Sequence, residues 1–249
     1  MNDVPPRLTP PRGVLFDFGN TLLREGPVNL EAGAAAVLAL ARDQAGCTPT
    51  HLAAAMTEVM NDLEPRRRTA LLEPPPGTIG RLVYSPLGIS FDVPPEEVEW
   101  AFWSAATSWE LEPGINAAIA AVERANIPWA VLSNTMFRGQ TIARQLALSG
   151  LRGSPRFVMA SADYTLRKPH PRLFAIAAAR LREPPHDLWF IGDSHEHDVC
   201  GSAAARLVPL WYCPHGAVSA AAPAVQVIGN WAEFPESLAV ACGRLGNDS

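Results

Sequence analysis

The sequence contains short apolar runs that each end abruptly at a polar residue, and this pattern limits the possible folds more than any other feature. Strands of a parallel sheet that helices cover on both faces read as continuous hydrophobic runs, because neither side of the strand meets water. Their carboxyl ends open together onto the crevice where such sheets bind ligands. The three clearest runs are Val14–Phe16, which ends at Asp17, Ala130–Leu132, which ends at Ser133, and Leu188–Ile191, which ends at Gly192 and Asp193.

Two weaker runs, Phe157–Met159 and Val208–Tyr212, raise the number of expected strands to five. Pro209 places the last of them at an edge of the sheet, because proline cannot donate a ladder hydrogen bond. Segments rich in Ala, Leu, Ile or Arg alternate with the strands and read as helices, at 115–125, 139–148, 171–181 and 199–205. This alternation predicts an α/β fold with a Rossmann-like parallel sheet core and helices on both faces.

The connection after the first strand is too long for a simple crossover. Residues 27–112 contain no apolar run of the same kind, and 30–42 and 50–68 read as helices. We therefore predict an α-helical cap domain at 27–112, inserted into an α/β core made of residues 13–26 and 113–249, with residues 1–12 as a loose N-terminal arm. Either the aromatic side chains of the insert form its own core or some of them face a substrate; they are Trp100, Phe102, Trp103 and Trp109.

Charge and cysteine usage exclude several classes of protein. The net charge is −5 and no basic run is longer than Arg66–Arg68, so the chain lacks the electrostatic footprint of a nucleic-acid or acidic-lipid binder. The 4 cysteines are widely spaced without a C-x-x-C pair, which fits a reducing compartment and no zinc site. The first 12 residues resemble neither a signal peptide nor a membrane span. We expect a cytoplasmic monomer or homodimer that binds a small molecule, with no nucleic acid and no membrane as partner.

Carboxylates follow two of the predicted strands. Asp17 directly follows the first, and Asp193 and Asp198 follow the strand at 188–191. If all three face one crevice, their charges are tolerable only around a cation, and an all-oxygen site suits Mg²⁺. This hypothesis requires the carboxyl groups of Asp17 and Asp193 to lie within about 8 Å of each other, a gap that one Mg²⁺ can bridge through water.

Lys168 is the only lysine among the 20 lysine and arginine residues of the chain. A chain that otherwise uses arginine has a reason to keep one compact point charge, such as a contact with a single phosphate oxygen. Ser133 and Asn134 add a hydroxyl and an amide suited to the same group. These residues predict an anion-binding position at the edge of the sheet where the carboxylates lie.

Taken in order, four segments resemble the four motifs of the haloacid dehalogenase-like (HAD) hydrolase superfamily: Asp17-x-Gly19-x-Thr21, Ser133-Asn134, Lys168-Pro169 and Gly192-Asp193-Ser194-x-x-x-Asp198. The insert resembles that family's C1-type cap. The resemblance implies a Mg²⁺-dependent phosphatase that acts on a small phosphorylated metabolite, with Asp17 as the nucleophile that becomes phosphorylated. It further implies that Mg²⁺ is held by Asp17, the backbone carbonyl of Gly19, Asp193 and Asp198, and the phosphoryl group by Ser133, Asn134 and Lys168.

Gly19 departs from the family's phosphatases, which carry a second Asp at this position as general acid and then base. Such proton transfer typically contributes ~10²- to 10⁴-fold, so we expect slow hydrolysis of ordinary phosphate esters. The nearest candidates for a replacement acid are His195, Glu196 and His197. Two alternatives stay open: a dehalogenase or phosphonatase-type hydrolase, whose branches also lack this Asp, and a catalytically degenerate ligand-binding protein. The acidic pair near 193–198 favours metal-dependent chemistry, because the family's dehalogenases work without a metal.

Overall fold

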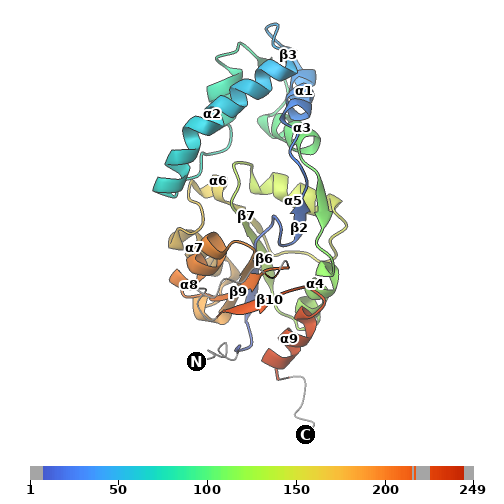
Figure 1. Cartoon of the computed structure of the whole chain (residues 1–249), viewed down its shortest axis with the longest axis vertical. Coiled ribbons are helices and arrows are strands. Elements are labelled where there is room, and N and C mark those ends of the chain that lie inside the picture. Colours follow the sequence, from blue (N-terminus) through green and yellow to red (C-terminus); the bar gives the residue numbers. More distant parts are fainter. Residues whose placement is uncertain (1–7, 215, 217–224, 244–249) are drawn as a thin grey trace.

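A computed structural model describes residues 8–214, 216 and 225–243, and its centre is a six-stranded parallel β-sheet (Figure 1). From one edge to the other, the strands are β10 (Gln226–Ile228), β9 (Val208–Tyr212), β8 (Leu188–Gly192), β1 (Gly13–Phe16), β6 (Trp129–Ser133) and β7 (Val158–Ala160). The chain proceeds outward from β1 to β7 and then returns to β8, so the strand order reverses beside β1. Open α/β sheets bind their ligands at such a reversal.

Helices cover both faces of the sheet, and the side chains of each strand alternate between two hydrophobic clusters. In β1, Val14 and Phe16 belong to one cluster and Leu15 to the other. The first cluster includes side chains of α4 (Ile115–Arg124), α5 (Gly139–Leu148) and α9 (Phe234–Ala241), and the second those of α7 (Pro171–Leu181). β1, β6 and β8 are buried along their whole length, which explains why they read as continuous apolar runs. The shorter helical elements of the core are α6 (Ser161–Tyr164), η2 (Pro185–Asp187), η3 (His195–Cys200) and α8 (Gly201–Ala204).

The predicted Rossmann-like α/β fold is confirmed, but the sheet has one strand more than the sequence predicted. β10 lies outside β9, so the placement of β9 at the edge of the sheet was wrong. The pairing of β9 with β10 begins at Leu210, one residue after Pro209, and the missing N–H of the proline is therefore not needed there. The expected helix at 199–205 is only α8, because the π-helical turn η3 precedes it.

The predicted insert, residues 27–112, is mainly helical and has a hydrophobic cluster of its own. The chain leaves and re-enters the α/β core through the antiparallel pair β2 (Leu23–Glu25) and β5 (Trp109–Leu111). Between them lie α1 (Leu30–Leu40), β3 (Ala41–Asp43), α2 (Pro49–Ala70), η1 (Gly80–Tyr84), β4 (Ser90–Phe91) and α3 (Pro95–Ala106). The first predicted helix ends at Leu40 rather than at residue 42, because β3 pairs with β4. The separate cluster includes Val37, Leu52 and Met56, and Figure 1 shows α1, α2 and α3 above the sheet.

Two groups of contacts hold the insert against the core. Residues 71–73, just after α2, pair with residues 165–167 through two backbone hydrogen bonds of 3.1 and 3.3 Å. On the other side, Glu99 of α3 accepts hydrogen bonds from the backbone N–H of Arg138 (2.7 Å) and from the hydroxyl of Thr141 (2.5 Å). The insert is therefore attached at two places to loops and helices that follow the strands.

Residues 1–7 of the predicted N-terminal arm lie outside the described residues. In the rest of the arm, the carbonyl of Thr9 accepts a hydrogen bond from the indole of Trp189 (3.2 Å), and Arg12 forms an ion pair with Glu183 (2.8 Å). This part of the arm contacts the core. Among the helices of the described residues, none combines the length and the apolar character needed to cross a membrane.

Candidate active site

Four charged side chains meet beside the reversal of strand order. Asp17 follows β1, Asp193 follows β8, Asp198 lies in η3, and Lys168 lies on the loop before α7. One carboxylate oxygen from each of the three aspartates lies within 4.8 Å of the others. The condition set by the sequence hypothesis, a separation of at most about 8 Å, is therefore met.

The ammonium of Lys168 joins two of these carboxylates. Its Nζ donates to Oδ1 of Asp17 and to Oδ1 of Asp198, each at 2.6 Å, and the lysine is only 2% exposed. The other oxygen of Asp198 accepts the backbone N–H of Ser194 at 3.0 Å. Gly192 makes room for this carboxylate, because a Cβ there would lie 2.3 Å from Asp198 Oδ2. Asp198 is thus fixed from two sides.

The cluster carries more negative than positive charge. Burial, together with the charges of Asp198 and Asp193, raises the pKa of Asp17 to about 7 against the opposing effect of Lys168. Burial and the charge of Asp198 raise the pKa of Asp193 to about 6. The two carboxylates outweigh burial at Lys168 and raise its pKa to about 12. Three carboxylates and one ammonium have a net formal charge of −2, which is costly in a buried place without a counter-ion.

These residues fit a divalent, oxygen-preferring cation. The donor set consists of carboxylates only, the donor atoms are close enough to share one ion, and the net charge would be balanced. Gly19, whose carbonyl is expected to be a further ligand, borders the same cavity as Asp17 and Asp193. The assignment of individual metal ligands stays a prediction.

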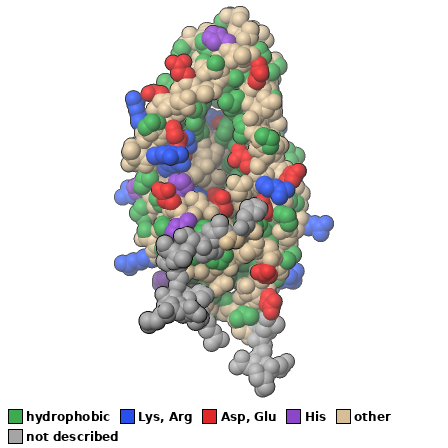
Figure 2. Space-filling model, viewed as in Figure 1, with side chains coloured by type: hydrophobic (Ala, Val, Ile, Leu, Met, Phe, Trp, Pro, Cys, Tyr) green, Lys and Arg blue, Asp and Glu red, His purple; other side chains and the backbone are tan. Residues whose placement is uncertain are grey.

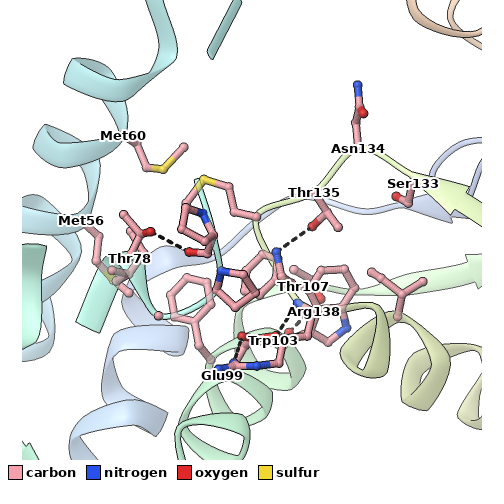
Figure 3. Close-up of a pocket in the computed structure, with 18 of the residues that line it drawn as sticks. Met56, Met60, Thr78, Glu99, Trp103, Thr107, Ser133, Asn134, Thr135 and Arg138 are labelled. Carbon is pink, nitrogen blue, oxygen red and sulfur yellow. Dashed lines mark hydrogen bonds and ion pairs between the residues drawn. The ribbon is translucent and has the colours of Figure 1, made fainter. Parts of the chain in front are cut away.

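Ser133 and Asn134 both border this cavity, but their contacts differ. The amide of Asn134 holds the backbone of Lys168: Oδ1 accepts from the Lys168 N–H at 2.7 Å, and Nδ2 donates to its carbonyl at 2.9 Å. One hydrogen of Nδ2 remains for a ligand. The hydroxyl of Ser133 makes no hydrogen bond within the described part of the chain. Ser133 is the last residue of β6, and Figure 3 shows Asn134 and Thr135 following it. Asn134 therefore positions the lysine, and Ser133 has the freer donor.

Only one of the three candidates for a replacement acid borders the cavity. His197 does so, with its Nδ1 3.1 Å from the hydroxyl of Ser194. Glu196 is exposed, and His195 packs edge-on against Trp211 with 5.1 Å between the ring centroids. Neither of these two lines the cavity of the charged cluster.

The space next to Gly19 is open, and an aromatic ring lies on its far side. A Cβ at this position would find its nearest neighbour, the ring of Trp109, at 3.9 Å. That ring packs on Phe18 with 4.7 Å between centroids and stacks on Trp103 at 5.3 Å. The place two residues after Asp17 therefore offers an apolar wall instead of a carboxyl group.

A cavity of about 1190 Å³ extends from the charged cluster into the insert. Figure 2 shows the molecule hollowed between the helical insert and the core, and Figure 3 shows part of the wall. Phe102, Trp103 and Trp109 border the cavity, whereas Trp100 lies under the guanidinium of Arg144 at 4.2 Å. Phe102 belongs to the core of the insert and also borders the cavity, and whether any of these rings faces a substrate stays a prediction.

Sequence reasoning missed several residues of this region. Met56 and Met60 lie one helical turn apart on α2 and border the cavity, and helical periodicity within 50–68 could have placed them on one face. Glu73 is buried against the core with its side chain 0% exposed. No local pattern marks Glu73, because its partners come from distant parts of the chain.

The fold and the site define an α/β enzyme with a Rossmann-like sheet and an inserted helical unit. A family model described as haloacid dehalogenase-like hydrolase matches residues 11–206, and the chain therefore belongs to this family of hydrolases. The family resemblance stated from the sequence motifs is confirmed. The C1 type of the cap stays a prediction.

Two curated relatives match part of the chain. Over 106 residues it is 31% identical to haloacid dehalogenase-like hydrolase domain-containing protein 3 of Xenopus laevis, covering 43% of this chain and 41% of that protein. Over 115 residues it is 28% identical to a phosphoserine phosphatase of Thermus thermophilus, covering 46% and 45%. The chain thus spans less than half the length of these relatives.

Solved structures of two activities share the fold. A HAD phosphatase from Thermococcus onnurineus and a 2-haloacid dehalogenase from Pseudomonas syringae pv. Tomato DC3000 both give a TM-score of 0.60, and each match covers 91% of this chain and 97% of the other. The sequence identities are 17% and 19%. The fold is common to both activities, so the choice between them depends on the site.

Proposed function

We propose that the protein is a Mg²⁺-dependent phosphatase that acts through an aspartyl-phosphate intermediate on Asp17. The observation that carries this proposal is the cluster of Asp17, Asp193 and Asp198 around the ammonium of Lys168. An anionic phosphoryl group can approach this cluster only if its charge of −2 is balanced, and a divalent cation would supply that balance. The phosphoserine phosphatase among the relatives is consistent with the same activity.

Each side chain has a role that follows from its contacts. Asp17 Oδ1 accepts from Lys168, and no described residue donates a hydrogen bond to Oδ2, which is the oxygen we assign to attack phosphorus. Lys168 keeps a positive charge beside the phosphoryl oxygens, and Ser133 donates its hydroxyl to one of them. Mg²⁺, when bound, would neutralise charge on the transferred group; Asp17, Asp193, Asp198 and the Gly19 carbonyl would hold it.

The test is phosphate release from a panel of phosphate monoesters with and without Mg²⁺. We expect slow but measurable turnover that needs Mg²⁺ and disappears in Asp17→Asn. Asp62→Asn is the matched control, since Asp62 is exposed on α2 and has no part in the cluster. Turnover that survives Asp17→Asn would exclude the assigned nucleophile.

Gly19 favours a second candidate, a dehalogenase or phosphonatase-type hydrolase. Halide release from a 2-haloacid in the absence of metal, with no phosphatase activity, would support this function instead of the first. Gly19→Asp distinguishes a weakened phosphatase from a degenerate binding protein. The new side chain has room at this position, so the substitution adds the missing proton-transfer group without a steric clash at its Cβ. We expect a gain of about 10²-fold in phosphatase rate, within the usual range for general acid–base catalysis. Tight ligand binding without turnover in both forms would indicate the degenerate protein.

A further inference from the structure

The cavity beside the charged cluster is larger than a small phosphorylated metabolite requires. Its volume of about 1190 Å³ exceeds the roughly 300–1,000 Å³ of sites that enclose most of a drug-sized ligand. It is lined by Asp17 and Lys168 and also by Met56 and Met60 of α2. Figure 3 shows the two methionines on its wall. A substrate that fills this space carries a sizeable group beyond its phosphate.

One side of the wall near the charged cluster, formed by Trp103, Trp109 and Phe137, presents ring faces. The indole N–H of Trp103 donates to the side-chain carbonyl of Gln145 at 3.0 Å, and that of Trp109 donates to the hydroxyl of Thr107 at 2.8 Å. The ring of Phe137 packs edge-on against Trp103 with 4.8 Å between centroids. Both indole donors are therefore used within the protein, and what remains is an aromatic surface.

Three threonine hydroxyls of the wall are used locally. Thr57 donates to the carbonyl of residue 53 at 2.8 Å, Thr78 to that of residue 75 at 2.6 Å, and Thr107 to that of residue 103 at 2.7 Å. Each of these hydroxyls donates its only hydrogen to a backbone carbonyl, so it cannot also donate a hydrogen bond to a polar substrate. In the insert the cavity is lined by apolar side chains such as Met56, Met60 and Phe102, with Tyr84 and Arg81 as polar groups among them. The apolar side chains favour an apolar group there.

The glycine at position 19 affects which leaving groups the enzyme can expel. Gly19 supplies no acid, so unless His197 protonates the leaving oxygen, that oxygen departs with its negative charge, and this is easier for a weakly basic oxygen. A phenolic oxygen has a pKa of about 10, whereas water, as a guide to aliphatic alcohols, has about 15.7. The ring nearest to Gly19 is Trp109, so an aromatic leaving group would also find a ring to pack on.

We propose that the substrates are aryl phosphate monoesters, whose ring occupies the aromatic part of the cavity while the phosphate meets Asp17 and Lys168. This inference rests on the proposed phosphatase function. Asp17 Oδ2 forms a bond to phosphorus as the bond from phosphorus to the aryl oxygen breaks, and the aryloxide takes a proton from solvent. Water then attacks phosphorus, the bond to Asp17 breaks, and the water proton goes to solution. The sum is aryl phosphate plus water giving phenol plus hydrogen phosphate.

The experiment compares four esters with Mg²⁺: 1-naphthyl phosphate, phenyl phosphate, hexyl phosphate and O-phosphoserine. We expect kcat/KM to fall in that order, with about tenfold or more between naphthyl and phenyl, as for added apolar surface in a pocket, and at least about 100-fold between phenyl and hexyl, in line with the missing acid. Equal values for phenyl and hexyl phosphate would overturn the leaving-group argument. Equal values for naphthyl and phenyl phosphate would overturn the role of the aromatic wall.

Acetyl phosphate separates failure of this inference from failure of the proposed function. It is small and has a weakly basic leaving group, so the cluster alone should hydrolyse it in an Asp17-dependent reaction. Hydrolysis of acetyl phosphate without the aryl preference would reject the inference and keep the phosphatase. No hydrolysis of any ester or of acetyl phosphate would reject the phosphatase itself.

Binding of 1-naphthol, the leaving group, tests the cavity without metal or turnover. We expect saturable binding, followed by tryptophan fluorescence, that weakens at least about threefold in Met60→Gln, since a polar group then replaces an apolar side chain of the cavity wall. Leu148→Gln is the matched control, because Leu148 is 68% exposed on α5 and does not border the cavity. Equal binding by both variants, or none by the unaltered protein, would overturn the assigned location.

Discussion

Replacement of Glu73 by glutamine tests how the insert is held on the core. The Glu73 side chain is 0% exposed and accepts hydrogen bonds from Nε and Nη2 of Arg67 at 2.8 and 2.7 Å. Its second oxygen accepts the hydroxyl of Ser161 at 3.0 Å and lies 3.8 Å from Nε of Arg167. One buried carboxylate thus serves two arginines and a serine that come from the insert and from the core.

The magnitude follows from this burial. Removal of one partner from a buried ion pair costs about 3–5 kcal/mol. The lower end applies here, because Arg67 is 13% exposed and keeps a second partner, Glu64. A loss of about 3 kcal/mol lowers the Tm of a chain of this length by about 6–12 °C. Glu73→Gln has the same shape as Glu73, so the change in Tm reports charge and not packing.

The assay is calorimetric unfolding in metal-free buffer, with Glu64→Gln as the matched control. The side chain of Glu64 is 35% exposed and also pairs with an arginine, so its loss should cost at most about 1 kcal/mol, or about 4 °C. A Tm for Glu73→Gln within 4 °C of the control would refute the reasoning, because the two carboxylates would then contribute alike despite their different burial.

Three further predictions concern the charged cluster. In Gly192→Ala the new Cβ displaces the carboxylate of Asp198. We expect the Mg²⁺ affinity, measured by titration calorimetry, to fall about tenfold, as when the groups that support a metal ligand are altered. Gly229→Ala is the control, because Gly229 has open space around it and the affinity should stay unchanged. Because the pKa values of Asp17 and Asp193 are raised to about 7 and 6, the metal-free protein should lose stability as pH rises from 4 to 7. Mg²⁺ needs ionised ligands, so it should raise the Tm more at pH 7.5 than at pH 5. An effect of Mg²⁺ on Tm that is independent of pH would contradict this prediction. Asp17→Asn should raise the Tm of the metal-free protein at pH 8, because it removes a buried negative charge from a cluster with a net charge of −2; a lower Tm would contradict this.

The charged cluster could be predicted from the sequence because its members stand at fixed places relative to the strands. Asp17 is the first residue after β1, and Asp193 is the first after β8. Parallel strands bring such positions to one edge of the sheet, so an apolar run followed by an acid already fixes the approximate location. Lys168 was found for another reason, as the single lysine of an arginine-rich chain.

Other features depend on contacts that no local pattern reveals. β10 is a three-residue strand at the edge of the sheet, too short for an apolar run to mark it. That Asn134 binds phosphate stays a prediction, but no sequence pattern indicated that its amide also makes two hydrogen bonds to the backbone of Lys168, which lies 34 residues further along the chain. The cavity likewise results from the way the insert docks, and its volume cannot be inferred from the composition of α2 or α3.

The two sides of the active-site cavity are supported by different parts of the fold. The cluster around Asp17 and Lys168 is fixed by fully buried strands, whereas the opposite wall of the cavity depends on contacts such as those of Glu73 and Glu99. A loosened insert should therefore change the choice of substrate before it changes the chemistry of Asp17. For Glu73→Gln this means a higher KM for substrates with large apolar groups and an unchanged kcat for acetyl phosphate, which meets only the sheet edge. A fall in kcat for both kinds of substrate would indicate that the insert also positions the charged cluster.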